Sequence, residues 1–294
     1  MLTRRRIELL VALALISGPA FAQTPAAVPF PWDSLGRVLG TDLASVAGAY
    51  RYNFPRADLH VRVGDVIVAP ALALVGWAGF ATFGSDTVVV GDLVVTTPEL
   101  AVVLGRLAAE GVAVTAIHNH LAGEEPRLVF VHYMARGPAL TLAMKIRTVL
   151  AATGTPLPVR TTLPQPVTID TALVQRELGT AGKASGSVTQ LGFDLVTGTV
   201  TMDGVTVPAA LGLRSPINLQ SLSSDRVVGT GDFAVTGDKV DGILKALAQS
   251  GITTTAVHSH LIGETPTMYF IHFWADGAPA TVLRGLRDAL AAAR

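Results

Sequence analysis

Four of the seven histidines of this chain lie in two segments of matching sequence, and two more follow these segments at equal spacing. The first segment reads AIHNHLAGEEP at residues 116–126, and the second reads AVHSHLIGETP at residues 256–266. Each contains a His-x-His triplet, and a third histidine follows twelve residues after the triplet. Because imidazole is the commonest protein ligand for transition metals, this spacing indicates a metal site. The residues concerned are His118, His120, His132, His258, His260 and His272.

The His-x-His spacing predicts that two imidazoles share one face of a strand. Alternate residues of a β-strand point to the same side, so His118 and His120 are expected to point together. If the following loop pairs His118 with His132, all three imidazoles lie on one face of a hairpin and can share an ion. A register change of one residue would move His132 to the other face. The same geometry is expected in the second copy.

Glu124 and Glu264 lie in the loops GEEP and GETP and could complete each site. We expect each to act as a fourth ligand or as a catalytic general base. Three neutral imidazoles and a carboxylate suit zinc or another divalent transition metal. A bound ion with one open position can activate water, which would make the protein a metal-dependent hydrolase. The sequence leaves open whether the protein is an enzyme.

The histidines could instead be half-buried hairpin residues that hold the fold together. Phe130 and Phe270 are expected on the histidine face, which favours this interpretation. The two copies also count as little more than one observation, because a duplication transmits whatever its ancestor had. Neighbouring positions nevertheless differ between the copies, as Asn119 and Ser259 do, while the histidines are unchanged. The metal site and the structural role therefore both stay open.

A second polar cluster occurs only in the first half, within YRYNFPRADLHVRV at residues 50–63. If this segment is one strand, Arg56, Asp58 and His60 lie on the same face. Such a row is usually a solvated sheet face, but it could form a pocket for an anion or a carboxylate. The protein would then be a non-catalytic binding or structural module. Its partner would be an unknown small molecule or a component of the cell envelope.

The elements that must position these residues occur twice in the chain. Residues 111–137 and 251–277 share 13 identities in 27 gap-free positions, and weaker matches continue upstream to the dipeptides Gly91-Asp92 and Gly231-Asp232. Each copy shows Val- and Thr-rich strands, a helix with an apolar stripe, the histidine hairpin and a closing helix.

These repeated patterns predict an α+β protein with two tandem repeats of a two-layer unit. Each repeat is expected to have an antiparallel sheet with packed helices, and a pseudo-twofold axis is expected to relate the repeats. The first repeat is predicted at residues 33–154 and the second at 170–294. The segment 155–169 between them carries several prolines and is predicted to be an extended linker.

The N-terminus predicts export from the cytoplasm. A basic start at Arg4, Arg5 and Arg6, an apolar run and Ala20-Phe21-Ala22 are typical of a signal peptide cleaved after Ala22. The mature protein would then be periplasmic or secreted.

Composition excludes several classes of function. The formal net charge is zero, and loss of residues 1–22 would leave about −2, so no basic field for nucleic acid is expected. The chain has no cysteine, which excludes disulfides and thiolate metal sites. Residues 66–85 carry no charge, but Pro70, Gly76 and Gly79 interrupt them. We therefore expect a buried hairpin there and no membrane span in the mature chain.

The two histidine segments extend to HNHLAGEEPRLVFVHYMARG and HSHLIGETPTMYFIHFWADG. With these strings, and with FPRADLHVRV and GDLVVT, the sequence resembles the LppY/LpqO-like family over nearly the whole mature chain. The resemblance implies an exported bacterial protein of two repeats whose defining domain has no assigned function. Some members are lipoproteins, but this chain has no cysteine for lipid attachment. The chemistry must therefore be argued from the residues.

Overall fold

The computed structural model describes residues 32–46, 48–83, 85–159 and 169–294. The predicted signal peptide at residues 1–22 and most of the predicted linker lie outside these ranges. None of the helices within them combines the length and the apolarity that crossing a membrane requires.

The main helices and strands follow the same order in both repeats. The first contains α1 (Ser34–Leu39), β1 (Leu43–Val46), β2 (Tyr50–Pro55), β3 (Arg62–Val63), β4 (Val66–Ile67), α2 (Pro70–Ala73), β5 (Val75–Phe83), β6 (Asp86–Thr96), α3 (Thr97–Ala109), β7 (Ala113–His118), β8 (Glu124–Glu125), β9 (Leu128–Gly137) and α4 (Ala139–Leu150). The second contains α5 (Thr171–Leu178), β10 (Lys183–Ser185), β11 (Val188–Phe193), β12 (Thr201–Met202), β13 (Val205–Thr206), β14 (Ser215–Ser221), β15 (Val227–Thr236), α6 (Gly237–Gln249), β16 (Thr253–His258), β17 (Met268–Gly277) and α7 (Pro279–Ala293). The short elements α2 and β8 of the first repeat have no counterpart among the described elements of the second.

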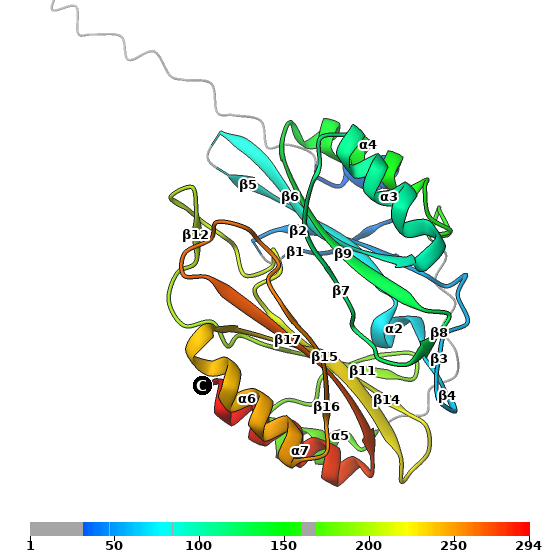
Figure 1. The fold of residues 1–294 in the computed structure, drawn as a ribbon, viewed down its shortest axis with the longest axis vertical. Coiled ribbons are helices and arrows are strands. Elements are labelled where there is room, and N and C mark those ends of the chain that lie inside the picture. Colours follow the sequence, from blue (N-terminus) through cyan, green and yellow to red (C-terminus); the bar gives the residue numbers. More distant parts are fainter. Residues whose placement is uncertain (1–31, 47, 84, 160–168) are drawn as a thin grey trace, which may run out of the picture. The chain divides into compact units, whose positions relative to one another are not determined.

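Each repeat is built on a six-stranded antiparallel sheet. The strand orders β1-β2-β5-β6-β9-β7 and β10-β11-β14-β15-β17-β16 correspond strand for strand. Helices α1, α3 and α4 pack on the first sheet, and α5, α6 and α7 pack on the second (Figure 1). The predicted α+β architecture of two tandem repeats is therefore confirmed.

Strand alternation gives each sheet one face for its helices and one face for the other repeat. In β6, Leu93 belongs to the core beneath the helices of the first repeat. Its neighbours Val90 and Val94 point the other way and join apolar clusters that contain residues of both repeats. Because both faces are covered, β6 is buried along nearly its whole length.

Two apolar clusters connect the inner sheet faces. One brings Trp77 of the first repeat together with Leu211 and Phe270 of the second. The other brings Phe130 of the first repeat together with Val228 of the second. Residues 32–294 therefore form one compact unit in which the two repeats share part of their core.

Reciprocal hydrogen bonds reveal a pseudo-twofold axis between the edge strands β7 and β16. The hydroxyl of Thr115 donates to the carbonyl of His260 at 2.6 Å, and that of Thr255 donates to the carbonyl of His120 at 2.8 Å. Each repeat thus offers the other the same contact, as a twofold relation requires.

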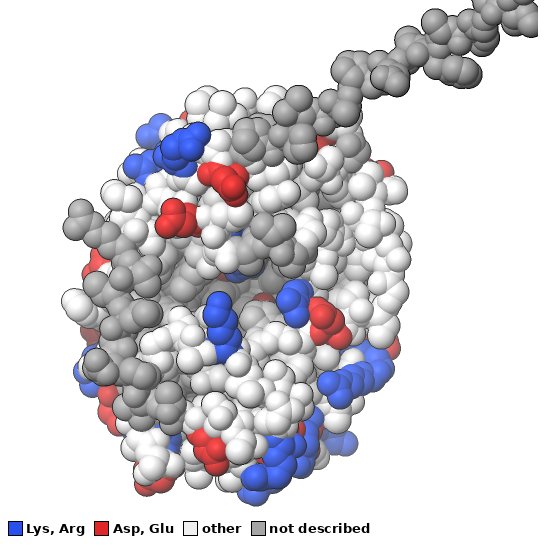
Figure 2. Space-filling view, turned by 180° about the vertical axis from the view of Figure 1, so that it is seen from behind, with Lys and Arg blue, Asp and Glu red and all other residues white. Residues whose placement is uncertain are grey.

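Charged side chains add contacts at the surface. Arg226 of the second repeat pairs with Asp65 of the first and with Asp276 of β17. On the face drawn in Figure 2, basic and acidic side chains are interspersed. This distribution agrees with the balanced net charge of the sequence.

Gly91 and Gly231 occupy positions where adjacent strands leave no space for a side chain. A Cβ at Gly91 would lie 2.3 Å from the carbonyl oxygen of Trp77. At Gly231 it would lie 2.1 Å from the carbonyl oxygen of Pro216. Glycine is therefore required in β6 and β15 by the close approach of the neighbouring backbone.

We expect Gly231→Ala to lower the free energy of unfolding by about 1–3 kcal/mol, because the backbone of β14 must move to admit the methyl group. Urea unfolding measures this change. Gly105→Ala is the control: its Cβ would meet nothing within 4 Å on the exposed side of α3. That substitution should stabilise the protein by about 0.5–1 kcal/mol. A Gly231→Ala variant as stable as the wild type would contradict the close approach.

Candidate metal centre

The histidine hairpins place their imidazoles on one sheet face, as the spacing predicts. In the first repeat, His118 pairs with Phe130 and Ala116 pairs with His132. The expected pairing of His118 with His132 was wrong by two residues. The face is nevertheless the expected one, because a shift of two residues preserves strand alternation. The second hairpin repeats this register at His258 and His272.

The six imidazoles form one cluster rather than two separate sites, because the histidine faces of the two repeats meet. His118 stacks on His258 across the pseudo-twofold axis, with ring centroids 3.8 Å apart and planes at 16°. The ring centroids of His120 and His272 are 4.1 Å apart, and those of His132 and His260 are 3.9 Å apart. In each of these three pairs the partners come from different repeats.

Three groups of three imidazoles bring their ligand nitrogens within 4.8 Å of one another. The predicted set of the second repeat is one of these groups, whereas the other two combine residues of both repeats. The groups are His118, His120 and His272; His118, His132 and His258; and His258, His260 and His272.

Backbone carbonyls fix the orientation of three imidazoles. The Nδ1 atom of His132 lies 3.1 Å from the carbonyl oxygen of Gly91, and that of His272 lies 3.0 Å from Gly231. The Nδ1 atom of His260 lies 2.8 Å from the carbonyl oxygen of Gly212. Because a carbonyl can only accept, each Nδ1 must carry the hydrogen and donate it. In a neutral ring the Nε2 atom is then left with a free lone pair, the form that binds a metal.

Those three Nε2 atoms are buried without a hydrogen-bond partner in the described part of the chain. Both ring nitrogens of His118 and of His258 share this condition. An unsatisfied buried polar atom costs about 1–3 kcal/mol, so seven such nitrogens in one cluster are costly unless a ligand binds them.

Two buried aspartates lie beside the imidazoles. Oδ2 of Asp92 is 3.4 Å from Nε2 of His120, and Oδ2 of Asp232 is 3.9 Å from Nε2 of His260. The other carboxylate oxygen of each has no hydrogen-bond partner among the residues that the structure describes. The Gly-Asp dipeptides were recognised in the sequence as part of the repeat but not as site residues. A carboxylate conserved between both copies inside an apolar strand is the signal that could have identified them.

Aromatic rings hold the outer histidines in place. His120 stacks on Phe130 with ring centroids 3.6 Å apart, and His260 stacks on Phe270 at 3.3 Å. The phenylalanines that favoured a purely structural interpretation are thus also able to orient metal ligands.

The surroundings of the cluster differ between the repeats. The guanidinium carbon of Arg51 lies 4.0 Å from the centroid of the Trp77 ring. Strand register places Gln190 and Pro216 at the equivalent positions of the second repeat. Burial lowers the pKa of Arg51 to about 10 against the attraction of both aspartates, so this side chain stays cationic at neutral pH.

Burial keeps the six imidazoles neutral at physiological pH. It lowers the pKa of His120 to about 3. For the other five, burial is again the largest cause of a lowered pKa, and neighbouring imidazoles lower it further. Burial also raises the pKa of Asp92 to about 6 and that of Asp232 well above its ordinary range. Neutral imidazole is the protonation state in which histidine binds a metal ion.

Glu124 and Glu264 are buried but bind the backbone of their own loops. The carboxylate of Glu124 accepts from the N–H of Leu128 at 3.1 Å, and that of Glu264 accepts from the N–H of Met268 at 3.0 Å. Glu124 also pairs with Arg127 at 3.3 Å. Neither glutamate belongs to the three imidazole groups. Their predicted roles as fourth ligands or catalytic bases stay predictions, and these contacts give them a part in shaping the loop.

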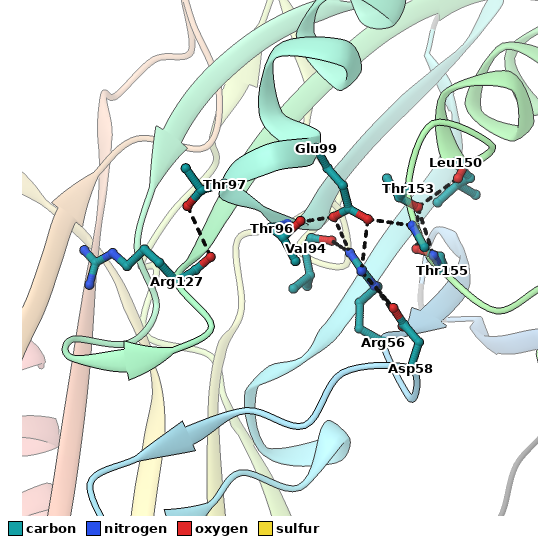
Figure 3. A network of polar contacts seen from close by, with 11 residues as sticks. Arg56, Asp58, Val94, Thr96, Thr97, Glu99, Arg127, Leu150, Thr153 and Thr155 are labelled. Atoms are coloured by element: carbon teal, nitrogen blue, oxygen red, sulfur yellow. Dashed lines mark hydrogen bonds and ion pairs between the residues drawn. The ribbon is translucent and has the colours of Figure 1, made fainter.

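The predicted strand face with Arg56, Asp58 and His60 is wrong, because β2 ends at Pro55 and the chain turns. Arg56 is 1% exposed, and its guanidinium binds the carboxylates of Asp58 and Glu99 and the carbonyl of Val94 (Figure 3). His60 is exposed. The ligand-binding role stays a prediction, and the contacts of Arg56 connect the turn to the start of α3.

A family model described as Domain of Unknown Function (DUF1259) matches the chain twice, at residues 33–152 and 172–292. The chain therefore belongs to this family and carries two copies of its domain. No curated protein matches the chain with significance.

Two solved structures align over most of the chain. The crystal structure of EtuB from Clostridium kluyveri is 13% identical, covers 85% of this chain and 90% of its own, and has a TM-score of 0.22. The crystal structure of PduB, a trimeric bacterial microcompartment shell protein, is 14% identical, covers 86% and 90%, and has a TM-score of 0.23. TM-scores this low carry no argument about fold or function.

We expect Arg56→Ala to lower the free energy of unfolding by about 3 kcal/mol, because it leaves two carboxylates without their shared buried partner. Chemical denaturation measures the loss. Arg62→Ala is the matched control: Arg62 makes one exposed hydrogen bond to the carbonyl of Asp65, and its removal should change stability by less than about 0.5 kcal/mol. Equal effects of the two substitutions would contradict the structural role of Arg56.

We expect the metal-free protein to lose stability as the pH falls from 7 to 5. The folded-state pKa values of the six imidazoles lie below the unfolded value of about 6.5, so in this range the unfolded chain takes up more protons. Asp92 and Asp232 oppose this trend, because their folded-state pKa values are raised. The six imidazoles outnumber these two carboxyl groups, so we expect a net loss of stability. Urea titrations of chelator-treated protein at pH 7, 6 and 5 test the slope. A flat profile would show that the imidazoles are not held neutral.

Proposed function

We propose that this protein is an exported metal-binding protein. Its two repeats together hold a divalent transition metal, zinc or a related ion, at the six-histidine centre. The single observation that supports this best is the orientation of His132, His260 and His272. Their Nδ1 atoms contact backbone carbonyls, and their buried Nε2 atoms have no partner among the described residues.

A cation could bind a buried imidazole nitrogen and a buried carboxylate oxygen that do not bind each other. Nε2 of His260 lies 3.9 Å from a carboxylate oxygen of Asp232, which is too far for a hydrogen bond between them. A metal ion accepts electron pairs from both atoms at once. Imidazole nitrogen together with carboxylate oxygen is a ligand set that zinc, copper, nickel, iron and manganese share.

Burial favours a tightly held ion over turnover of a large substrate. His118, His132, His260 and His272 are 7%, 1%, 4% and 2% exposed. A metal-dependent hydrolase would also need an open coordination position and a path for substrate. We therefore propose metal binding as the function, and a metal-dependent hydrolase as the finer form of this proposal. A non-catalytic ligand-binding or structural module of the cell envelope is the alternative.

Export and the LppY/LpqO-like resemblance belong to the same proposal. They are supported by the signal-peptide pattern before Ala22 and by the histidine segments in the sequence. Metal binding would then take place in the periplasm or outside the cell.

We expect protein purified without a histidine tag to contain metal, to lose it to a chelator and to regain it from Zn²⁺ or Co²⁺. At a free ion concentration of 100 times Kd, binding to the folded state should add about 2.7 kcal/mol to stability and raise Tm by several degrees. Elemental analysis and thermal melts with and without chelator measure both effects.

The matched variants are His118→Ala, inside the centre, and His60→Ala, on the surface. His118→Ala should weaken metal retention and reduce the chelator-dependent change in Tm, whereas His60→Ala should keep both. Substoichiometric metal that does not return on reconstitution would reject the proposal. If His118→Ala instead lowers Tm equally with and without chelator, the histidines serve only as structural residues.

A further inference from the structure

We propose that the centre holds two metal ions, each bound by the His-x-His triplet of one repeat and the third histidine of the other. This inference rests on the proposed function, since it requires the centre to bind metal. It adds the number of ions and the way in which the two repeats share the ligands.

The first ion would be bound by His118, His120 and His272, which we call the first group. Their ring centroids are 5.0 Å apart for His118 and His120, 5.2 Å for His118 and His272, and 4.1 Å for His120 and His272. All three rings are therefore in mutual contact, and their ligand nitrogens lie within 4.8 Å of one another.

The second ion would be bound by His258, His260 and His132, which we call the second group. Its ring centroids are 5.1 Å apart for His258 and His260, 5.4 Å for His132 and His258, and 3.9 Å for His132 and His260. The pseudo-twofold axis relates the first group to the second, which corresponds to it residue for residue. Of the two, only the first is among the sets of described residues whose ligand nitrogens all lie within 4.8 Å of one another, so the second group would have to close slightly around its ion.

His120 and His260 distinguish ligand sets shared between the repeats from sets that lie within one repeat. His120 has its closest imidazole neighbour, His272, in the other repeat, and the same holds for His260 with His132. The set His258, His260 and His272 also lies within 4.8 Å, which keeps binding within a repeat as the competing arrangement. The reciprocal short contacts of His120 and His260 favour the shared arrangement.

One ion cannot use all six imidazoles. Zinc binds imidazole nitrogen at about 2.0–2.1 Å and takes four ligands in most sites, so two ligand atoms on one ion lie at most about 4.2 Å apart. Within the described ranges, no set larger than three has its ligand atoms within even 4.8 Å. A single ion would leave several of the buried nitrogens without a partner.

Each group has its own carboxylate. Oδ2 of Asp92 lies 3.4 Å from Nε2 of His120 in the first group, and Oδ2 of Asp232 lies 3.9 Å from Nε2 of His260 in the second. Two ligands of one tetrahedral zinc ion are about 3.4 Å apart at these bond lengths. Three imidazoles and one carboxylate therefore give each ion four ligands, and each carboxylate offsets one of its two charges.

Metal stoichiometry tests the number of ions. Chelator-treated wild-type protein is loaded with Zn²⁺ or with Co²⁺, freed of excess ion by desalting, and measured by elemental analysis against protein concentration. We expect two ions per chain. One ion per chain would overturn this inference and leave metal binding intact. No retained ion would overturn the proposed function itself.

Two double variants, each lacking two imidazoles, test the sharing of ligands. His120→Ala with His272→Ala removes two ligands of the first group and should leave one ion per chain. His120→Ala with His132→Ala removes one ligand from each group and should lose or weaken both ions. Binding within each repeat predicts the reverse order, and that result would reject the shared arrangement.

Circular dichroism establishes that each variant is folded before its metal is measured. If a double variant does not fold, the single substitutions His120→Gln and His260→Gln replace it, because each keeps a polar side chain. Each should retain one of the two ions. Retention of the full wild-type number by both variants would overturn the inference.

Discussion

The meeting of the two histidine faces across β7 and β16 is the interaction on which the rest of this structure depends. Thr115 and Thr255 hold these strands together through reciprocal hydrogen bonds to the carbonyls of His260 and His120. Those bonds use the backbone of the outer histidines, so the same contact that joins the repeats also positions two imidazoles of the cluster. A metal bound there would connect the repeats through their side chains as well.

The fold places this polar cluster in apolar surroundings. In β6, Asp92 lies between Val90 and Val94, which enter different apolar clusters shared by the repeats. Low polarity strengthens electrostatic interactions and raises the cost of polar atoms without partners. The same surroundings explain why the imidazoles are neutral and why the aspartates resist ionisation in the absence of a cation. Burial therefore raises the free energy of the centre when no ligand is bound. It also favours a positively charged ligand over a neutral or negative one.

The two repeats carry the same potential metal ligands, but the residues that surround these ligands differ. The histidines, the aspartates and the stacked phenylalanines are present in both halves. Arg51 and Trp77 occur only in the first, where Arg51 adds a positive charge close to both aspartates. The two halves of the centre therefore have the same donor atoms in different electrostatic fields, which gives them a physical basis for different affinities.

The sequence determined those features that depend on local periodicity. The i, i+2 spacing of His118 and His120 assigned them to one strand face, and an even change of register left that assignment correct. The apolar stripe in each copy likewise predicted a helix before the histidine hairpin, and α3 and α6 occupy these positions. Short-range patterns suffice there because neighbouring residues decide the outcome.

Only the tertiary structure decided which residues share the centre. His118 and His258 are 140 positions apart, and their contact depends on how two sheets pack, which no local pattern encodes. Asp92 entered the centre for the same reason. Arg56 was assigned to a strand by alternation, but the chain turns after Pro55 and buries the guanidinium against Glu99 on another element. Periodicity specifies the side to which a residue points, whereas its partner is set by the packing of distant segments.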